Sequence, residues 1–158
     1  MTPVRWLLPA ALLLVPTSAV IAQRATTAPQ APPAMKPVAS TKQIMQAMVA
    51  PSSKILFEAV STVQTQTGTV ERAPKTDEEW ATVEHAAVMV AEAGNLLMMG
   101  RRAQDRGRWM RMSLEMTEAA AVALKAVEAK DASALFLSGE RIYDACDACH
   151  ARYQPSQK

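Results

Sequence analysis

Two cysteines and a histidine stand close together near the C-terminus, as Cys146, Cys149 and His150. On a helix, positions i, i+3 and i+4 share one face within about one turn. Two thiols placed in this way can add to the two vinyl groups of a haem while the neighbouring imidazole reaches the iron. The spacing Cys-x-x-Cys-His is typical of covalent haem attachment. The motif therefore predicts one covalently bound haem c, with His150 as the proximal iron ligand.

Other uses of these cysteines fit less well. A thiol–disulfide oxidoreductase keeps its reactive cysteine near a helix N-terminus, where the helix dipole lowers the thiol pKa. This pair is expected at the end of the last helix instead. A structural zinc site needs four protein ligands, whereas the motif supplies three and the rest of the chain holds one histidine, His85, and no cysteine. A disulfide across so short a loop would add little stability.

The N-terminal segment has the pattern of a secretory signal peptide. Arg5 provides a short positive region, an apolar stretch follows it, and small residues suited to cleavage lead up to Ala22. Two prolines interrupt the segment, and its apolar part is shorter than the roughly 20 residues that span a bilayer. We therefore predict that residues 1–22 are removed and that the mature protein is periplasmic, without stable membrane insertion. An uncleaved membrane anchor is the alternative.

Length and composition indicate one helical domain. The chain has 158 residues and a formal net charge of +2, which suits a single compact domain whose core needs no disulfide. The near balance of charge gives no indication of nucleic acid as a partner. Residues 23–38 are rich in Pro, Ala and Thr and are expected to form a flexible leader. Residues 39–158 are expected to form the domain.

The first two helical stretches have recognisable start signals. The first is expected to begin after Ser40, a good N-cap, and to run to about Gln66. Pro51 falls inside it and should kink or split it. The second begins after Thr76, which has capping-box spacing to Glu79, and stops near residue 100.

Two further helical stretches complete an all-α fold. The third is predicted from about Trp109 to Ala129, and the fourth begins at Asp131 or Ser133, carries the cysteine motif and ends at Pro155. No convincing strand pattern is present. An antiparallel four-helix bundle, with haem attached to the C-terminal helix, is the natural way to bury four apolar stripes.

The run from Tyr143 to Tyr153, together with the motif's place on the last of four helices, resembles class II c-type cytochromes. This family contains cytochrome c prime and its low-spin, Met/His-ligated relatives, and the resemblance covers roughly residues 40 to 154. Class I cytochromes c place the motif near the N-terminus instead. The resemblance implies an electron carrier, not an enzyme, that exchanges single electrons with redox partner proteins.

The resemblance also implies that the first helix supplies the distal side of the haem. A methionine there gives a six-coordinate electron carrier, whereas a non-ligand leaves an open site that binds small gases. Met45 lies about where the family's distal residue falls and is the expected sixth ligand, with Met48 in reserve. Methionine is also a common core filler, so a five-coordinate gas-binding protein is the alternative. Gas-binding members tend to carry an Arg one turn earlier, where this chain has Thr41.

The other candidate residues have structural interpretations. His85 is off the apolar stripe of the second helix and is expected at the surface, and Trp80 and Trp109 are expected to fill the core. Five arginines crowd the turn between the second and third helices. They are expected to form a solvated face, with a propionate contact or a docking patch as the alternative. These arginines are Arg101, Arg102, Arg106, Arg108 and Arg111. Pairing of two copies and a role as accessory subunit of a larger redox complex also stay open.

Overall fold

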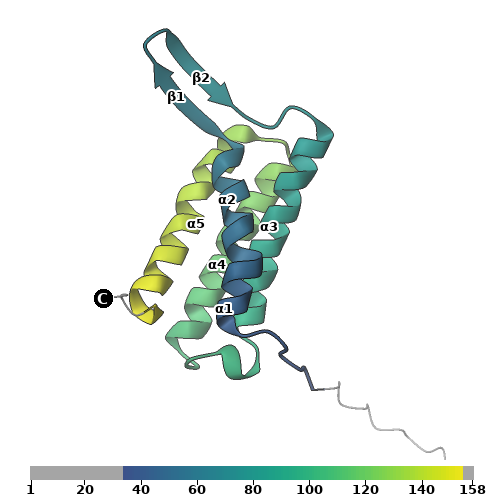
Figure 1. The fold of residues 1–158 in the computed structure, drawn as a ribbon, viewed down its shortest axis with the longest axis vertical. Coiled ribbons are helices and arrows are strands. Elements are labelled where there is room, and N and C mark those ends of the chain that lie inside the picture. Colours follow the sequence, from purple (N-terminus) through teal and green to yellow (C-terminus); the bar gives the residue numbers. More distant parts are fainter. Residues whose placement is uncertain (1–33, 155–158) are drawn as a thin grey trace, which may run out of the picture. The chain divides into compact units, whose positions relative to one another are not determined.

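A computed structural model describes residues 34–154 of the chain (Figure 1). The elements, in chain order, are α1 (Thr41–Ile44), η1 (Met45–Val49), α2 (Ala50–Ala59), β1 (Ser61–Thr65), β2 (Gly68–Arg72), α3 (Asp77–Leu97), η2 (Gly100–Arg102), α4 (Arg108–Glu128) and α5 (Ala132–Tyr153). The sequence predicts an all-α fold, and the described residues are mostly helical with one small two-stranded sheet. The predicted signal peptide, most of the predicted leader and the predicted stop at Pro155 lie outside the described residues. Within residues 34–154, no helix is both long and apolar enough to cross a bilayer.

The first helical run starts where the sequence predicts. α1, η1 and α2 follow one another without a break (Figure 1). Ser40 is the N-cap: its hydroxyl accepts the amide N–H of Gln43 at 3.3 Å, and the Gln43 side chain accepts the amide N–H of Ser40 at 2.9 Å. This reciprocal capping box satisfies two amides that have no partner inside the helix.

Pro51 changes the winding of this run without breaking it. η1 is a π-helical turn, in which the amide of Ala50 donates to the carbonyl of Met45, five residues earlier. In a regular α-helix a proline lacks the N–H for its bond, and its ring clashes with the carbonyl four residues before it. A wider turn ahead of the proline relieves that clash. The kink predicted from Pro51 therefore takes the form of a local π-helix.

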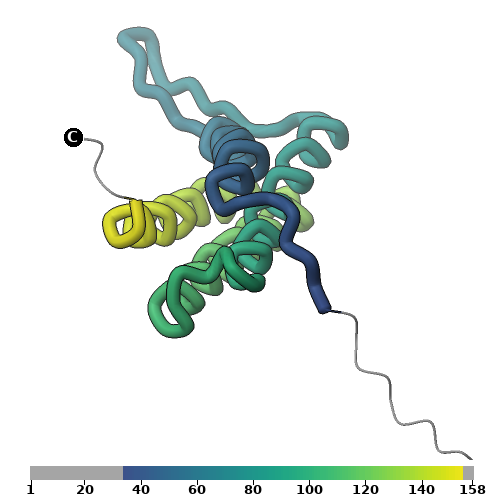
Figure 2. Tube along the Cα trace, turned by 60° about the horizontal axis from the view of Figure 1, so that its bottom comes forward, coloured from purple at the N-terminus to yellow at the C-terminus, as the bar shows by residue number. Residues whose placement is uncertain are grey.

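The first helix ends at Ala59, so the prediction that it continues to Gln66 is wrong. The residues beyond it form an antiparallel hairpin of β1 and β2, with Thr65 paired to Gly68. This segment is rich in β-branched residues, whose stiff side chains favour extended backbone, and Gly68 adopts a φ of 140° that suits the turn. The hairpin is exposed along almost its whole length and projects away from the helices in both views (Figures 1 and 2).

The remaining three helices match the predicted stretches. Thr76 caps α3 and forms the predicted capping box with Glu79. Asp131, rather than Ser133, caps α5, because its carboxylate accepts the amide N–H of Ala134 at 2.9 Å. α4 follows the loop that comes after η2. The order of helices and the position of the cysteine motif at the end of the last one are as the sequence predicts.

A hydrophobic core runs between the helices. α3 packs against both α2 and α4, and α4 packs against α5, whereas α2 and α5 contact each other far less. Trp80 and Trp109 are both buried, which confirms their predicted place in the core. Gly94 lets α3 and α4 approach closely: a Cβ there would lie 2.8 Å from the carbonyl oxygen of Ser113. Packing is therefore tightest around α3 and α4 and loosest between the first helical run and α5.

Arg102 departs from the predicted solvated face of arginines. Its side chain is 7% exposed, and it donates from Nε to the carbonyl of Ala39 at 2.8 Å and from Nη1 to the carbonyl of Leu96 at 2.7 Å. The carbonyl of Leu96 lies in the last turn of α3, where helix carbonyls attract a cation, and this attraction together with the bond to Ala39 draws the guanidinium inward. The prediction was wrong for this residue, and the other four arginines of the cluster are exposed.

Candidate functional site

A groove of about 710 Å³ lies between the start of the first helical run and the end of α5. Small-molecule and cofactor sites occupy about 300–1,000 Å³, so its volume suits a cofactor. The lining comes from α1, η1, the loop before α4, the start of α4, and the end of α5. The residues are Thr41, Lys42, Met45, Gln46, Gln104, Trp109, Cys149, His150, Tyr153 and Gln154.

The groove brings together the two residues that the sequence analysis assigns to opposite faces of a haem. Met45 lines it from η1, and His150 lines it from the end of α5. Met48 is half-buried but does not line this groove, and it packs against the hydrophobic core instead. Of the two candidate methionines, Met45 is therefore the one that shares this groove with His150.

The two cysteines lie on the last turns of α5. Cys149 lines the groove, and Cys146 is half-buried one turn earlier. Burial raises the pKa of the Cys146 thiol, and the neighbouring Cys149 raises it further; burial also raises the pKa of the Cys149 thiol. A disulfide oxidoreductase needs a thiol with a lowered pKa. This environment therefore disfavours that class, in agreement with the position of the pair at the end of a helix.

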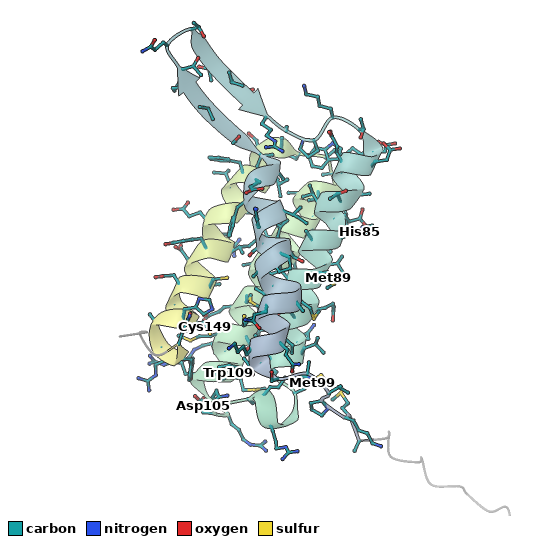
Figure 3. All side chains as sticks on the ribbon, in the orientation of Figure 1. His85, Met89, Met99, Asp105, Trp109 and Cys149 are labelled. Atoms are coloured by element: carbon teal, nitrogen blue, oxygen red, sulfur yellow. The ribbon has the colours of Figure 1, made fainter. Side chains whose placement is uncertain are left out.

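Trp109 and Tyr153 form an aromatic wall of the groove. Their ring centroids are 4.9 Å apart in an edge-to-face arrangement with an interplanar angle of 79°, a favourable geometry for aromatic pairs. Figure 3 shows Trp109 at the same end of the helices as Cys149. The sequence predicts Trp109 in the core, and it includes Tyr153 in the run that carries the resemblance without giving it a role in the site. The available signal was spacing, because Tyr153 follows Cys149 by four positions and so shares its helical face.

Asp105 connects this wall to the backbone of the loop before α4. Its Oδ1 accepts the amide N–H groups of Gly107 at 2.8 Å and Trp109 at 3.1 Å, and its Oδ2 accepts the hydroxyl of Tyr153. The hydroxyl of Tyr153 and these amides lower the pKa of the Asp105 carboxyl. The same hydrogen bond raises the pKa of Tyr153. Sequence spacing does not reveal this contact, because it joins a loop to the end of a distant helix.

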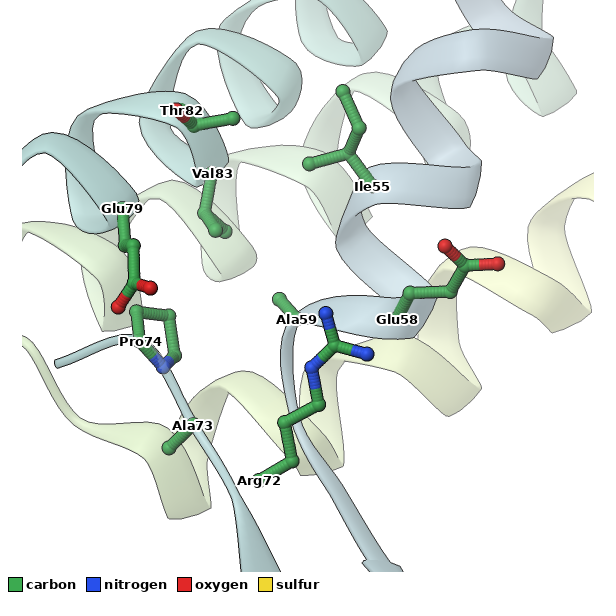
Figure 4. A pocket seen from close by; sticks show the side chains of 9 residues that line it. All are labelled: Ile55, Glu58, Ala59, Arg72, Ala73, Pro74, Glu79, Thr82 and Val83. Atoms are coloured by element: carbon green, nitrogen blue, oxygen red, sulfur yellow. The ribbon is translucent and has the colours of Figure 1, made fainter.

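Other parts of the described chain offer less chemistry. His85 is exposed on α3, as predicted, and lies away from the groove (Figure 3). A hollow of about 250 Å³ lies at the base of the hairpin (Figure 4), but the Glu79 carboxylate there is already bonded to the backbone amides of Lys75 and Thr76. Across residues 34–154, no three His, Cys, Asp or Glu side chains gather as a metal site would require. The groove beside Cys149 is the candidate functional site.

Comparisons with protein-family models, curated proteins and solved structures found no match to this chain.

Proposed function

We propose that this protein is an exported monohaem c-type cytochrome that transfers single electrons between redox partner proteins. One observation carries the proposal: Met45 and His150 line a single groove from two different helices, with Cys149 beside His150. A thioether and an imidazole are a known pair of haem axial ligands. The proposal includes one covalent haem c and assigns no catalytic residue.

Four features of the groove and of the helix beside it support a haem. The volume is that of a cofactor site. The two thiols are spaced for two attachments on one face of α5, and the buried ring of Trp109 offers an apolar surface for a macrocycle. Packing of α5 against α1 and η1 is sparse, so the space beside the thiols is not filled by the helical run on the other side of the groove.

Each residue has a defined role in this proposal. Each thiol, of Cys146 and of Cys149, adds across one vinyl group to give a thioether, which fixes the cofactor to α5. His150 holds the iron from the proximal side and Met45 from the distal side. A haem bound in this way supplies a one-electron iron couple, and Met/His ligation favours a higher potential than two histidines. Trp109 and Tyr153 limit the access of water to one side.

Covalent attachment is the first test. The full chain is expressed in an export-competent host with cytochrome c maturation and is extracted with acid–acetone. We expect the haem to stay with the protein, the double variant Cys146→Ala/Cys149→Ala to lose it, and His85→Ala, at an exposed site, to behave as wild type. The mass of the mature protein should place the cleavage near Ala22. Complete release of haem from the wild type would show the proposal to be wrong.

The distal ligand is tested by a matched pair of methionine variants. Met45→Ala should convert the ferric haem from low spin to high spin, because it removes the sixth ligand. Met48→Ala removes the same side chain one turn away and should leave the absorption spectrum unchanged. The reverse result assigns the ligand to Met48. A wild type that is already high spin, with neither variant changing the spectrum, favours the five-coordinate gas-binding alternative.

A further inference from the structure

Three helix ends meet at one side of the groove. The indole N–H of Trp109, in the first turn of α4, donates to the carbonyl of Leu97, the last residue of α3, at 2.9 Å. Tyr153, the last residue of α5, packs its ring against Trp109 and donates its hydroxyl to Asp105. Figure 3 shows Asp105 and Trp109 together at this end. One cluster thus joins the end of α3, the start of α4 and the end of α5.

The Asp105 carboxylate, the acceptor in this cluster, is held in place by contacts that do not involve Tyr153. Asp105 Oδ1 is held by the backbone amides of Gly107 and Trp109, so the carboxylate cannot turn freely. Its second oxygen is left aimed at the phenol. Hydrogen bonds to an ionised acceptor are about twice as strong as bonds between neutral groups. Tyr153 therefore binds to a preformed anchor on a different part of the chain.

The end of α5 needs such an anchor. The last carbonyls of a helix have no intrahelical donor, and the last turn tends to fray. On its groove side, the end of α5 receives little support, because it has only sparse contact with α1 and η1 across the groove. The last turn is closed by the amide of Gln154, which donates to the carbonyl of His150 at 2.9 Å. This turn is the part of α5 that carries the expected proximal ligand.

We propose that Asp105, Tyr153 and Trp109 are positioning residues that hold the last turn of α5 and thereby set the orientation of the His150 imidazole. The inference rests on the proposed function for its effect on the haem. Its effect on the helix end depends only on the protein. Loss of the cluster should loosen the turn first and change axial ligation as a consequence.

Two conservative variants and one control test this role. Tyr153→Phe removes the hydroxyl and keeps the ring against Trp109. Asp105→Asn keeps an oxygen for the two backbone amides and removes the charge. Tyr143→Phe makes the same chemical change as Tyr153→Phe at an exposed position of the same helix. All three variants are made in the full holoprotein, and circular dichroism checks that the helices are retained.

Two measurements distinguish a role in positioning His150 from a role in supporting the helix alone. Hydrogen exchange of the Gln154 amide reports the closed last turn, and protection should fall about tenfold in Tyr153→Phe, as expected for the loss of one hydrogen bond to a charged group. The electron paramagnetic resonance signal of the ferric haem reports the orientation of the axial ligands, and it should shift in both cluster variants. Tyr143→Phe should match the wild type in both measurements.

The outcomes are distinguishable. Unchanged protection in Tyr153→Phe overturns the inference, and so does a fall in protection with an unchanged haem signal, because the contact would then support the helix without positioning His150. Failure of the proposed function is recognised separately, since acid–acetone extraction would remove the haem from the wild type before any variant is compared.

Discussion

Gly94 is the residue at which two helices of the core come closest. A Cβ at this position would lie 2.8 Å from the carbonyl oxygen of Ser113 on α4, and closer still to the hydroxyl of Thr117. The carbonyl belongs to a helix backbone and cannot rotate away, so α3 and α4 would have to separate. We predict that Gly94→Ala destabilises the protein by about 1–3 kcal/mol, the usual cost of overpacking a core. Urea denaturation followed by circular dichroism measures this change.

Gly139 provides the matched control for Gly94. It also lies inside a helix, but a Cβ there would be 3.8 Å from the ring of Phe57, an ordinary van der Waals contact. Alanine restricts the unfolded chain more than glycine does, so Gly139→Ala should stabilise the protein by about 0.5–1 kcal/mol. The two substitutions are predicted to have opposite signs. Equal effects at both positions would contradict the close approach of α3 and α4.

Arg102 and Arg101 form a second matched pair. Arg102→Ala removes the side-chain donors to the carbonyls of Ala39 and Leu96. Leu96 keeps the amide of Met99 as a donor, and we predict a loss of about 1–3 kcal/mol, mainly from the unsatisfied carbonyl of Ala39. Arg101 is exposed, and Arg101→Ala should change the free energy of unfolding by less than about 0.5 kcal/mol. Thermal denaturation of the two variants side by side is the measurement. Similar losses in both would refute a special role for Arg102.

At the scale of residues, the sequence predicts contacts that follow from local spacing and misses those that depend on the fold. The placement of Cys149 and His150 on the same helical face as Cys146 follows from their spacings of three and four residues. The burial of Arg102 and the contact between Asp105 and Tyr153 depend on how helix ends from distant parts of the chain pack together. Hydrogen bonds between distant segments leave no periodic signal, so no pattern within one element could reveal them.

Among the helices and strands, the π-helical turn before Pro51 has the most direct effect on which residues line the groove. One extra residue in this turn rotates the residues at its start by about 100° relative to α2, and Met45 is the first residue of the turn. We predict that Pro51→Ala lets a regular α-helix run through, because the new amide can bond four residues back. Met45 should then turn away from the groove, although the helix content is retained.

The ferric absorption spectrum tests this prediction. Pro51→Ala should reproduce at least part of the change to high spin expected for Met45→Ala, with an unchanged far-ultraviolet circular dichroism spectrum. Pro74→Ala, outside the helices and away from the groove, is the control for loss of a proline. A low-spin spectrum in Pro51→Ala would mean that the π-helical turn does not place Met45.

The elements themselves were predictable where start signals and periodicity agree. Ser40, Thr76 and Asp131 each mark a helix start in both the sequence and the structure. The hairpin was missed because β1 follows directly on a helical stretch whose apolar period continues through Val60 and Val63. There the preference of β-branched residues for extended backbone outweighs the continuing helical pattern.

For the whole molecule, ionised carboxylates hold several helix ends at once. Asp77, at the start of α3, pairs with Lys130 in the turn before α5 at 2.6 Å, and this pair lowers the pKa of Asp77. The backbone amides of Lys75 and Thr76 lower the pKa of Glu79. Asp105 binds the end of α5 and the start of α4. These carboxylates connect segments from both ends of the helical domain.

Acid stability follows from the sign of these shifts. A carboxyl whose pKa is lower in the folded state contributes its stabilisation above its unfolded pKa, about 4 for Asp and Glu, and loses it as the pH falls through the folded value. The free energy of unfolding should therefore change little between about pH 5 and pH 8 and fall below about pH 4. Because the slope measures protons taken up on unfolding, Asp105→Asn should make the acid limb shallower. Lys130→Gln, which removes the partner of Asp77 and no carboxyl, should do the same. Urea denaturation at a series of pH values measures the slope of the free energy of unfolding against pH. If both variants keep the wild-type slope, the helix ends are not held by these charges.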